Sequence, residues 1–364
     1  MQTLFSLITS IQQKLFPFIE ENISPLTEKE REFVRAAELA SVGKYSKALK
    51  KWIGNGRKPH NRKAIALAFI AKAVWNLPTT LLLINFLKSN QTLRMLCGWE
   101  WASDLPSEST FSRAFAEFSE SGLTELMHKG MVAANMEGMM ACHISTDSTA
   151  IEAREKPAKK PKKESKEKRK RGRAKKGEAR APIPPGRIRI QIGRSLAENL
   201  ASLPKQCDRG VKRGSSGNAK IWTGFKLHWG VADGDIPISV LLTSASLHDS
   251  QAAVPLMQMA SARMPYCYDL ADSAYDAKAI KEYSRSLGHV PIIDSNKRRG
   301  DKKQMCPAKK TRYKERGAVE RAFSNLKDNY GGRFIRVKGA AKVMAHLMFG
   351  VLALTAAQLC RLVE

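Results

Sequence analysis

Three acidic residues that lie far apart in the chain could together support metal-dependent chemistry. Asp147 follows a short predicted strand, Asp272 follows another, and Glu320 lies on a predicted helix. Carboxylates that converge on one point repel each other unless cations compensate their charge. Oxygen ligands of this kind suit Mg²⁺ or Mn²⁺, and a pair of such ions can activate the attacking oxygen and stabilise the leaving oxygen in phosphodiester displacement. A single acid at a strand end is more often a turn residue, so the hypothesis depends on the three acids together.

A polar stripe surrounds Glu320 on the helix predicted over 314–327. At about 100° per residue, Tyr313, Arg316 and Lys327 share with Glu320 a stripe roughly 60° wide. Arg316 stands four residues before Glu320, a spacing that allows an intrahelical ion pair. Beside a nucleic acid, the two cations would instead bind phosphates, and the phenol could stack on a displaced base. From the spacing alone, an ordinary solvated helix face is an equally good interpretation.

The elements that must position these residues alternate between strands and helices. The predicted order is strand, strand, strand, helix, strand, helix, strand, helix. Strands are predicted over 141–146, 222–231, 236–243, 266–271 and 290–293, and helices over 250–262, 276–287, 314–327 and 340–362. This is the element order of a ribonuclease-H-like α/β fold, a mixed sheet with flanking helices. Its first and fourth strands are neighbours, so we expect Asp147 and Asp272 to lie close together.

Residues 1–139 are predicted to form a separate all-helical domain. Apolar residues at helical spacing cover 28–52 and 62–75, and further helices are predicted over 78–87 and 110–118, with Ser107 as the N-cap of the last. Short helices joined by tight turns on a basic chain permit a helix-turn-helix DNA reader. A plain helical bundle is equally compatible with the pattern.

The remaining domain boundaries follow from composition. The catalytic domain is expected over 140–335, interrupted by a basic insertion at 155–220, and a C-terminal helix over 336–364. Within the insertion, residues 155–180 hold 14 lysines and arginines against 4 acids and show no apolar periodicity. Such a segment cannot bury a core, so we expect it to be disordered or to form a helix only on DNA. A nuclear-import signal is the rival interpretation of the same charge run.

The overall charge indicates a polyanionic partner. The chain has 62 Lys+Arg against 34 Asp+Glu, a formal net charge of +28. Duplex DNA is the commonest partner for such an excess, because neutralising its phosphates releases counterions. A charged tail without a specific role is the plainer alternative.

The cysteines and the apolar segments exclude other classes. The six cysteines are scattered without a C-x-x-C pair, which argues against a zinc cluster and a disulfide framework. The apolar stretches 64–87 and 343–360 are interrupted by polar residues, and neither offers the roughly 20 apolar residues of a membrane span. We therefore expect two buried helices and a reducing, intracellular location.

Six motifs together resemble those of the bacterial insertion-sequence DDE transposases. The spacing Tyr313-x2-Arg316-x3-Glu320-x6-Lys327 matches the Y-R-E-K signature of that family at every position. The other matches are Asp147-Ser148-Thr149, G-F-K-L-H at 224–228, the segment Thr243…His248-Asp249-Ser250, A-D-S-A-Y-D at 271–276 and P-S-E-S-T-F-S-R at 106–113. The likeness covers about residues 105–350 apart from the insertion.

The resemblance implies a role for each matched residue. Asp147, Asp272 and Glu320 would bind two Mg²⁺ or Mn²⁺ ions and form the catalytic site. The residues that would contact DNA or border the active site are Tyr313, Arg316, Lys327, Lys226, His228, His248, Asp249 and Arg113. A core histidine is the plainer interpretation of His228, and a helix cap that of His248 and Asp249.

The function implied by the resemblance is transposition. The enzyme would cleave DNA at the ends of an insertion sequence and join the freed 3′-hydroxyls to target DNA. We expect double-stranded DNA as the partner, at both transposon ends and target, with a homodimer on DNA and no membrane association, in the bacterial cytoplasm at the nucleoid. The alternatives are a DNA-binding protein without catalysis and a host nuclease that cuts but does not join.

Overall fold

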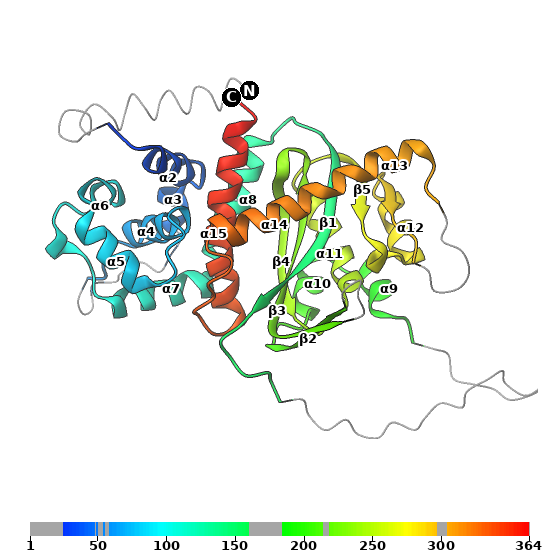
Figure 1. Cartoon of the computed structure of the whole chain (residues 1–364), viewed down its shortest axis with the longest axis horizontal. Helices are drawn as coiled ribbons and strands as arrows, with labels where there is room; N and C mark the ends of the chain where they lie inside the picture. Colours follow the sequence, from blue (N-terminus) through cyan, green and yellow to red (C-terminus); the bar gives the residue numbers. More distant parts are fainter. Residues whose placement is uncertain are drawn as a thin grey trace, which may run out of the picture.

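The computed structural model describes residues 25–363, except for 48, 50–53, 55–57, 160–183, 214–217 and 297–303. Most of the basic segment predicted over 155–180 therefore lies outside the described residues. The described chain consists of a helical N-terminal part and a sheet with flanking helices, and α8 and α15 lie between them (Figure 1).

The N-terminal part is helical, as predicted. Its helices are α2 (Glu28–Leu39), α3 (Val42–Ser46), α4 (Arg62–Val74), α5 (Thr80–Ser89), α6 (Gln91–Cys97), α7 (Glu108–Ser121) and α8 (Leu123–Asn135), with a 3-10 turn at Ala102–Asp104. Helix α2 begins with a capping box, in which Glu30 N donates to Thr27 Oγ1 at 3.3 Å and Thr27 N donates to the Glu30 carboxylate at 2.9 Å.

One helix prediction is wrong in its extent, and the predicted N-cap at Ser107 is confirmed in its position. The helix predicted over 28–52 ends at Leu39, because Ser41 adopts a left-handed conformation with φ 48° and redirects the chain into α3. Ser107 does stand at the N-cap position of α7, but its hydroxyl gives no cap hydrogen bond. It lies 3.0 Å from the Ser109 hydroxyl and 3.2 Å from that of Thr110 instead.

A six-stranded mixed sheet forms the second part. Its strands are β1 (Ala141–Glu152), β2 (Asp208–Arg213), β3 (Ala219–Ala232), β4 (Ile236–Ser244), β5 (Tyr266–Ala271) and β6 (Val290–Ile293). Strand β1 is antiparallel to β3 and parallel to β5, and β5 is parallel to β6. The long β3 pairs with β2 along its first half and with β4 along its second half. Apart from β2, this arrangement confirms the predicted ribonuclease-H-like mixed sheet.

The second half of the insertion predicted over 155–220 contains regular elements in the part that the structure describes. Residues 187–213 contain α9 (Arg187–Ile192), α10 (Leu196–Ser202) and β2. Tertiary contacts create these short elements: the buried Asn199 donates to Gln191 O and to the Gln258 side chain, each at 2.9 Å. Strand β2 forms because β3 extends six residues beyond its contact with β4.

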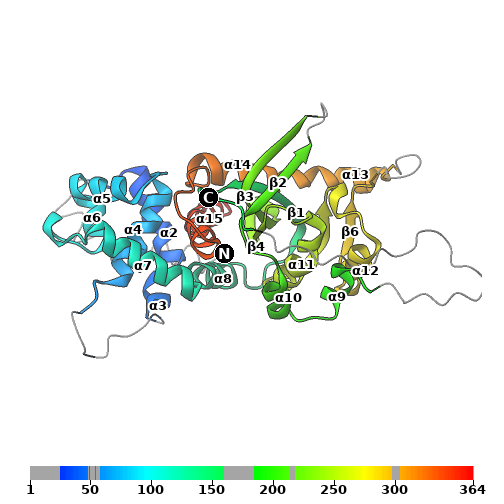
Figure 2. The same ribbon diagram turned by 90° about the horizontal axis from the view of Figure 1, so that it is seen from below.

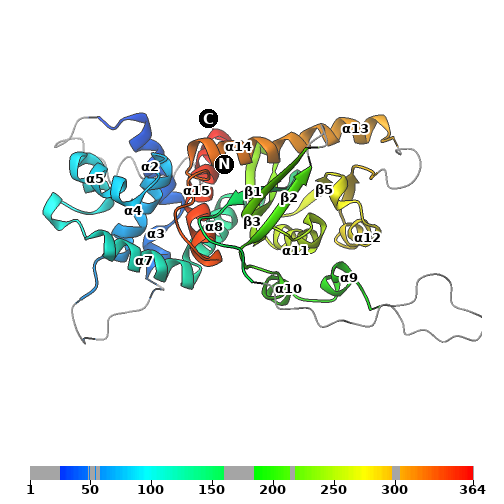
Figure 3. The ribbon, with the colours of Figure 1, turned by 60° about the horizontal axis from the view of Figure 1, so that its bottom comes forward.

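Helices cover both faces of the sheet. They are α11 (Ala253–Ser261), α12 (Lys278–Ser286), α13 (Pro307–Tyr313), α14 (Gly317–Asn329) and α15 (Ala340–Arg361), with 3-10 turns at Asp233–Asp235, Asp249–Ala252, Ser273–Tyr275 and Lys314–Arg316. Helix α14 crosses β1 and β3 on one face, whereas α11 packs on β3 and β4 from the other. Figures 2 and 3 show α13 continuing the line of α14, with α9, α10 and α12 on the side of α11.

Helix α15 joins the two parts through an aromatic cluster. The ring centroid of Phe349 in α15 lies 5.4 Å from that of Phe69, 6.2 Å from that of Phe115 and 6.5 Å from that of Phe118. The helix has the length and composition of a membrane span, but 83% of its most apolar window is buried within the protein. Its apolar character is accounted for by packing against α2, α4, α7, α8 and β4.

Candidate active site

Two of the predicted acids stand side by side on adjacent parallel strands. The last registered pair between β1 and β5 is Thr146 with Ala271. Asp147 on β1 and Asp272 directly after β5 are the residues that follow this pair, so their positions correspond. Asp147 Oδ1 accepts a hydrogen bond from Ser148 N at 2.7 Å, and Asp272 Oδ1 accepts one from Ala274 N at 2.9 Å. Each backbone hydrogen bond holds one carboxylate oxygen and leaves the second oxygen of that acid free of backbone contacts.

Strand β1 does not end before Asp147, in contrast to the prediction. It continues to Glu152, because β3 keeps pairing with it as far as Gly224. Asp147 thus lies at the point where β1 loses its neighbour β5 but retains β3. The backbone of Asp147 is therefore fixed by its pairing with β3, and the side of β1 on which β5 has ended is open at this point.

Arg316 links the third acid to this pair. Its Nη1 donates to Asp147 Oδ2 at 3.2 Å, and its Nη2 donates to Glu320 Oε1 at 2.5 Å. Burial lowers the pKa of Arg316, but nearby Tyr313 and the acids outweigh that effect and raise it above its ordinary value. The guanidinium therefore supplies the positive charge that compensates these carboxylates in this structure.

The polar stripe is not carried by one helix, so the helix predicted over 314–327 is corrected. Tyr313 ends α13, Arg316 lies in the 3-10 turn, and only Glu320 and Lys327 lie on α14. The residues nevertheless meet at β1, since Lys327 Nζ donates to Thr149 Oγ1 at 2.5 Å. The Arg316 guanidinium lies 5.9 Å from the Tyr313 ring centroid.

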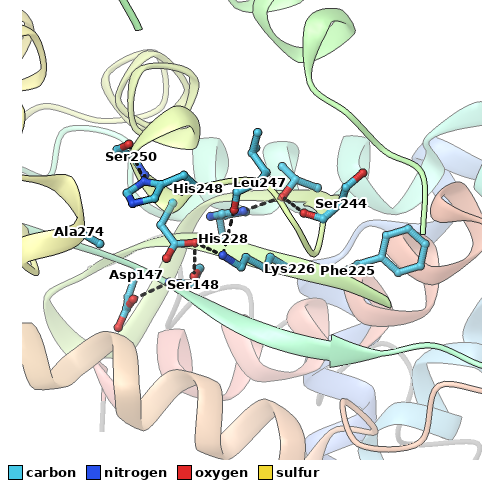
Figure 4. Close-up of polar contacts among 12 residues, drawn as sticks. Asp147, Ser148, Phe225, Lys226, His228, Ser244, Leu247, His248, Ser250 and Ala274 are labelled. Atoms are coloured by element: carbon cyan, nitrogen blue, oxygen red, sulfur yellow. Dashed lines mark hydrogen bonds and ion pairs between the residues drawn. The ribbon is translucent and has the colours of Figure 1, made fainter. Parts of the chain in front are cut away.

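A second polar network lies beside Asp147 (Figure 4). Asp249 Oδ1 accepts hydrogen bonds from Ser148 Oγ and Lys226 Nζ, both at 2.9 Å, and Lys226 also donates to Leu247 O at 2.9 Å. The Lys226 side chain is 14% exposed. It is thus held inside the protein, where it neutralises Asp249.

The two predicted histidines lie behind this network. His228 is completely buried, with Nε2 2.8 Å from Thr243 Oγ1, and burial lowers its pKa to about 4. This burial excludes direct contact of His228 with DNA in the present conformation and corrects that expectation. His248 Nδ1 lies 2.8 Å from Ser250 Oγ at the start of the 3-10 turn, in the position expected of a cap.

The acids differ in pKa according to their surroundings. Burial and the neighbouring charges of Asp272 and Asp249 raise the pKa of Asp147 to about 6, against the effects of the Ser148 N–H and Arg316. Burial also raises the pKa of Asp272 above its ordinary value. For Asp249, burial is outweighed by His228 and Lys226, and the pKa falls. Asp147 and Asp272 are therefore the acids with the greatest need of a further cation.

Not every predicted residue belongs to this cluster. Arg113 is exposed on α7 of the N-terminal part, where its Nη2 lies 3.4 Å from Thr110 Oγ1. Within the described ranges, no three acidic, histidine or cysteine side chains are close enough to hold one metal ion.

Tyr275 is a site residue to which the sequence analysis assigned no role. Its side chain is 1% exposed, and its hydroxyl has no hydrogen-bond partner in the described part of the chain. Burial raises its pKa well above the ordinary value, and Asp249, Asp147 and Asp272 add to this rise. The only available signal was its position three residues after Asp272 in the motif.

The sheet order and the acids on β1, after β5 and on α14 define the class of ribonuclease-H-like nucleases and transposases. Two family models match the chain: a transposase DDE domain over residues 200–356 and a transposase domain of the DUF772 family over residues 20–117. The chain belongs to the DDE transposases of insertion sequences. The DDE match includes Asp272 and Glu320, whereas Asp147 precedes it. No curated protein matches the chain.

Proposed function

We propose that Asp147, Asp272 and Glu320 are the metal ligands of this transposase and bind two Mg²⁺ or Mn²⁺ ions. The observation that supports this most strongly is the equivalent placement of Asp147 and Asp272 on β1 and β5, with Glu320 joined to Asp147 through Arg316. The donor set fits, because all three residues offer carboxylate oxygens and two of them have raised pKa values. When bound, the ions would activate the attacking oxygen and stabilise the leaving oxygen.

The residues around the acids would position the DNA. Arg316 can exchange its carboxylate partners for a backbone phosphate, which its guanidinium binds by two parallel hydrogen bonds. Among the described residues, the hydrogen-bond partner of Lys327 is the neutral Thr149 hydroxyl, so its charge is available for a second phosphate. Tyr313 is half-buried beside Arg316 and presents a ring on which a displaced base could stack.

The Asp249 network would keep Asp147 in place. Lys226 and Ser148 hold Asp249, and Ser148 adjoins Asp147 on β1. We assign Lys226, Asp249 and His248 to the support of the active site, and Arg113 to a DNA contact of the N-terminal part. The domain limits follow the prediction: 1–139 for binding DNA ends and 140–335 for catalysis, with the insertion at 155–220 and the C-terminal helix at 336–364.

Transposition requires two DNA ends and a target at the same place. We propose a homodimer assembled on double-stranded DNA, in the bacterial cytoplasm at the nucleoid. The excess of basic residues supports DNA as the partner, since a net charge of +28 favours a polyanion. The insertion would strengthen binding most at low salt, where phosphate contacts matter most.

The test is a cleavage and joining assay on duplexes that carry the ends of the element. Wild-type protein should nick these ends with Mg²⁺, join the freed 3′-hydroxyl to target DNA and do neither in EDTA. Asp147→Asn, Asp272→Asn and Glu320→Gln should abolish both steps while binding of the ends survives. Cleavage by any of these variants at the wild-type rate would refute the assignment, and cleavage without joining would favour a nuclease.

A further inference from the structure

A cavity lies away from the acids, where the start of α15 meets the N-terminal helices. It has a volume of about 210 Å³ and is bordered by α4, α5, α7 and the segment around Lys338. The polar side chains that line it are Lys72, Thr80, Ser112, Lys338, Lys342 and His346. A water molecule takes up about 30 Å³ in the liquid, so the cavity has room for a group of several non-hydrogen atoms. No acidic residue is among its described lining residues.

Lys72 is the unusual member of this set. Its side chain belongs to the buried face of α4 and is only 7% exposed, yet no hydrogen bond or ion pair connects its ammonium to any described residue. Burial lowers its pKa to about 8, and no neighbouring acid counteracts that shift. The ammonium is therefore still mostly charged at neutral pH. A buried charge without a partner is costly, and a bound anion would remove that cost.

The other lining groups fit an anion with several oxygens. Lys338 and Lys342 are exposed at the rim and add two further charges, and Thr80 and Ser112 offer hydroxyl donors. A phosphate group accepts hydrogen bonds on each of its oxygens and suits three ammonium groups better than a single carboxylate does. Phe69 and Phe115 form the apolar wall, which excludes water and strengthens the charge interaction.

We infer that this cavity is a phosphate-binding site, in which Lys72, Lys338 and Lys342 hold a backbone phosphate of DNA at the junction of the helical part and α15. The choice of DNA as the source of the phosphate rests on the proposed function, whereas the site itself does not. A phosphate bound there would contact α4, α7 and α15 together. It would therefore fix the N-terminal helices relative to the sheet when DNA is present.

The experiment compares Lys72→Met with Lys88→Met, which removes an exposed lysine at the end of α5, outside the cavity. Lys72→Met keeps the chain length and removes an uncompensated buried charge, so this variant should melt a few degrees higher than wild type without ligand. Inorganic phosphate, titrated against chloride at equal ionic strength, should raise the melting temperature of wild type and Lys88→Met but not of Lys72→Met.

A second arm identifies the source of the phosphate. Binding of a short duplex oligonucleotide is measured in EDTA, so that the outcome is independent of metal-dependent cleavage. Lys72→Met should weaken this binding by roughly tenfold and lower the salt slope by about one, as expected for one lost phosphate contact. Should Lys72→Met fail to fold, the double variant Lys338→Gln/Lys342→Gln alters only exposed residues and should show the same losses.

The results of the two arms together decide between a DNA-phosphate site, a site for a small phosphate ligand and no site. Loss of both the phosphate response and duplex affinity supports a DNA-phosphate site. Loss of the phosphate response with unchanged duplex affinity would refute DNA as the source and assign the cavity to a small phosphate ligand. Responses of Lys72→Met equal to those of Lys88→Met in both arms would overturn the site.

Discussion

Asp147 lies beside Asp272 because the parallel pairing of β1 with β5 ends one residue before each of them. This relationship brings together two carboxylates separated by more than a hundred residues of sequence. Burial, and to a smaller extent the charge of Asp272, raise the pKa of Asp147 to about 6. The Arg316 guanidinium forms an ion pair with Asp147.

Arg316→Gln should tighten the binding of Mn²⁺ several-fold in the absence of DNA. The guanidinium contacts Asp147 and Glu320 and so competes with a cation for the same oxygens. Isothermal titration calorimetry with Mn²⁺ measures the change. Arg321→Gln is the control, because Arg321 pairs with Asp235 at 2.7 Å instead. Equal or weaker Mn²⁺ binding by Arg316→Gln would show that Arg316 does not occupy the cation's place.

Lys327→Gln should weaken the binding of end DNA several-fold and reduce its salt slope by about one. The fold should remain intact, because the lysine gives up only one hydrogen bond to the neutral Thr149 hydroxyl, worth about 1 kcal/mol. Fluorescence anisotropy at several salt concentrations measures both quantities. Thr149→Val removes the same hydrogen bond from the other side and should bind DNA normally. Wild-type affinity and slope in Lys327→Gln would exclude Lys327 from the DNA interface.

Gly224→Ala should lower the free energy of unfolding by about 3 kcal/mol or more, because it combines strain with overpacking. Gly224 has φ +150°, and an added Cβ would lie 2.1 Å from Ile151 O on β1. The control is Gly288→Ala, where φ is +86° but no atom lies within 4 Å. Only conformational strain of about 1–2 kcal/mol is expected there. Denaturant unfolding measures both, and similar losses in the two variants would contradict the close approach of β3 to β1.

Acid should destabilise the protein through three histidines whose pKa burial lowers: His128, His228 and His346. Burial lowers the pKa of His128 to about 3 and that of His228 to about 4, below the ordinary 6.5 of the unfolded chain. Below pH 6.5 these histidines bind more protons in the unfolded chain than in the folded one. Their full contribution to the free energy of unfolding is therefore present above pH 6.5, and it is lost as the pH falls towards the pKa of the folded state. At pH 5 each histidine should cost about 2 kcal/mol.

Thermal unfolding at pH 7.5 and pH 5 measures this effect. His128→Gln should show a smaller difference in melting temperature between the two pH values than wild type, since one of the three protonation steps is removed. The control variant is His143→Gln, because the His143 ring is hydrogen-bonded to the exposed Asp233 and is not one of the buried histidines. An identical pH response in His128→Gln and wild type would contradict the neutral, buried state of His128.

The strands of the catalytic part could be predicted well from the sequence. The limits of β5 and β6 agree with the prediction, because both are short apolar runs bounded by turn residues. The length of β1 could not be predicted, since it depends on pairing with β3 beyond Asp147. Local patterns carry no information on such a partner.

The candidate site, too, could be predicted from the sequence only in part. The spacing of Tyr313, Arg316, Glu320 and Lys327 predicted that they act together, but periodicity placed them on one helix. The 3-10 turn at Lys314–Arg316 separates Tyr313 from α14 and directs Arg316 towards Asp147. The burial of His228 and the unpartnered Tyr275 hydroxyl likewise depend on tertiary packing.

The most direct measurement is the number of Mn²⁺ ions that the full chain binds in the presence of uncleaved end DNA. Wild-type protein should bind two ions, and Asp147→Asn, Asp272→Asn and Glu320→Gln should each lose at least one while still binding the DNA. Asp249→Asn is the matched control and should retain both ions, because Lys226 already neutralises that acid. Undiminished Mn²⁺ binding in any one of the first three variants would contradict a metal site shared by these acids.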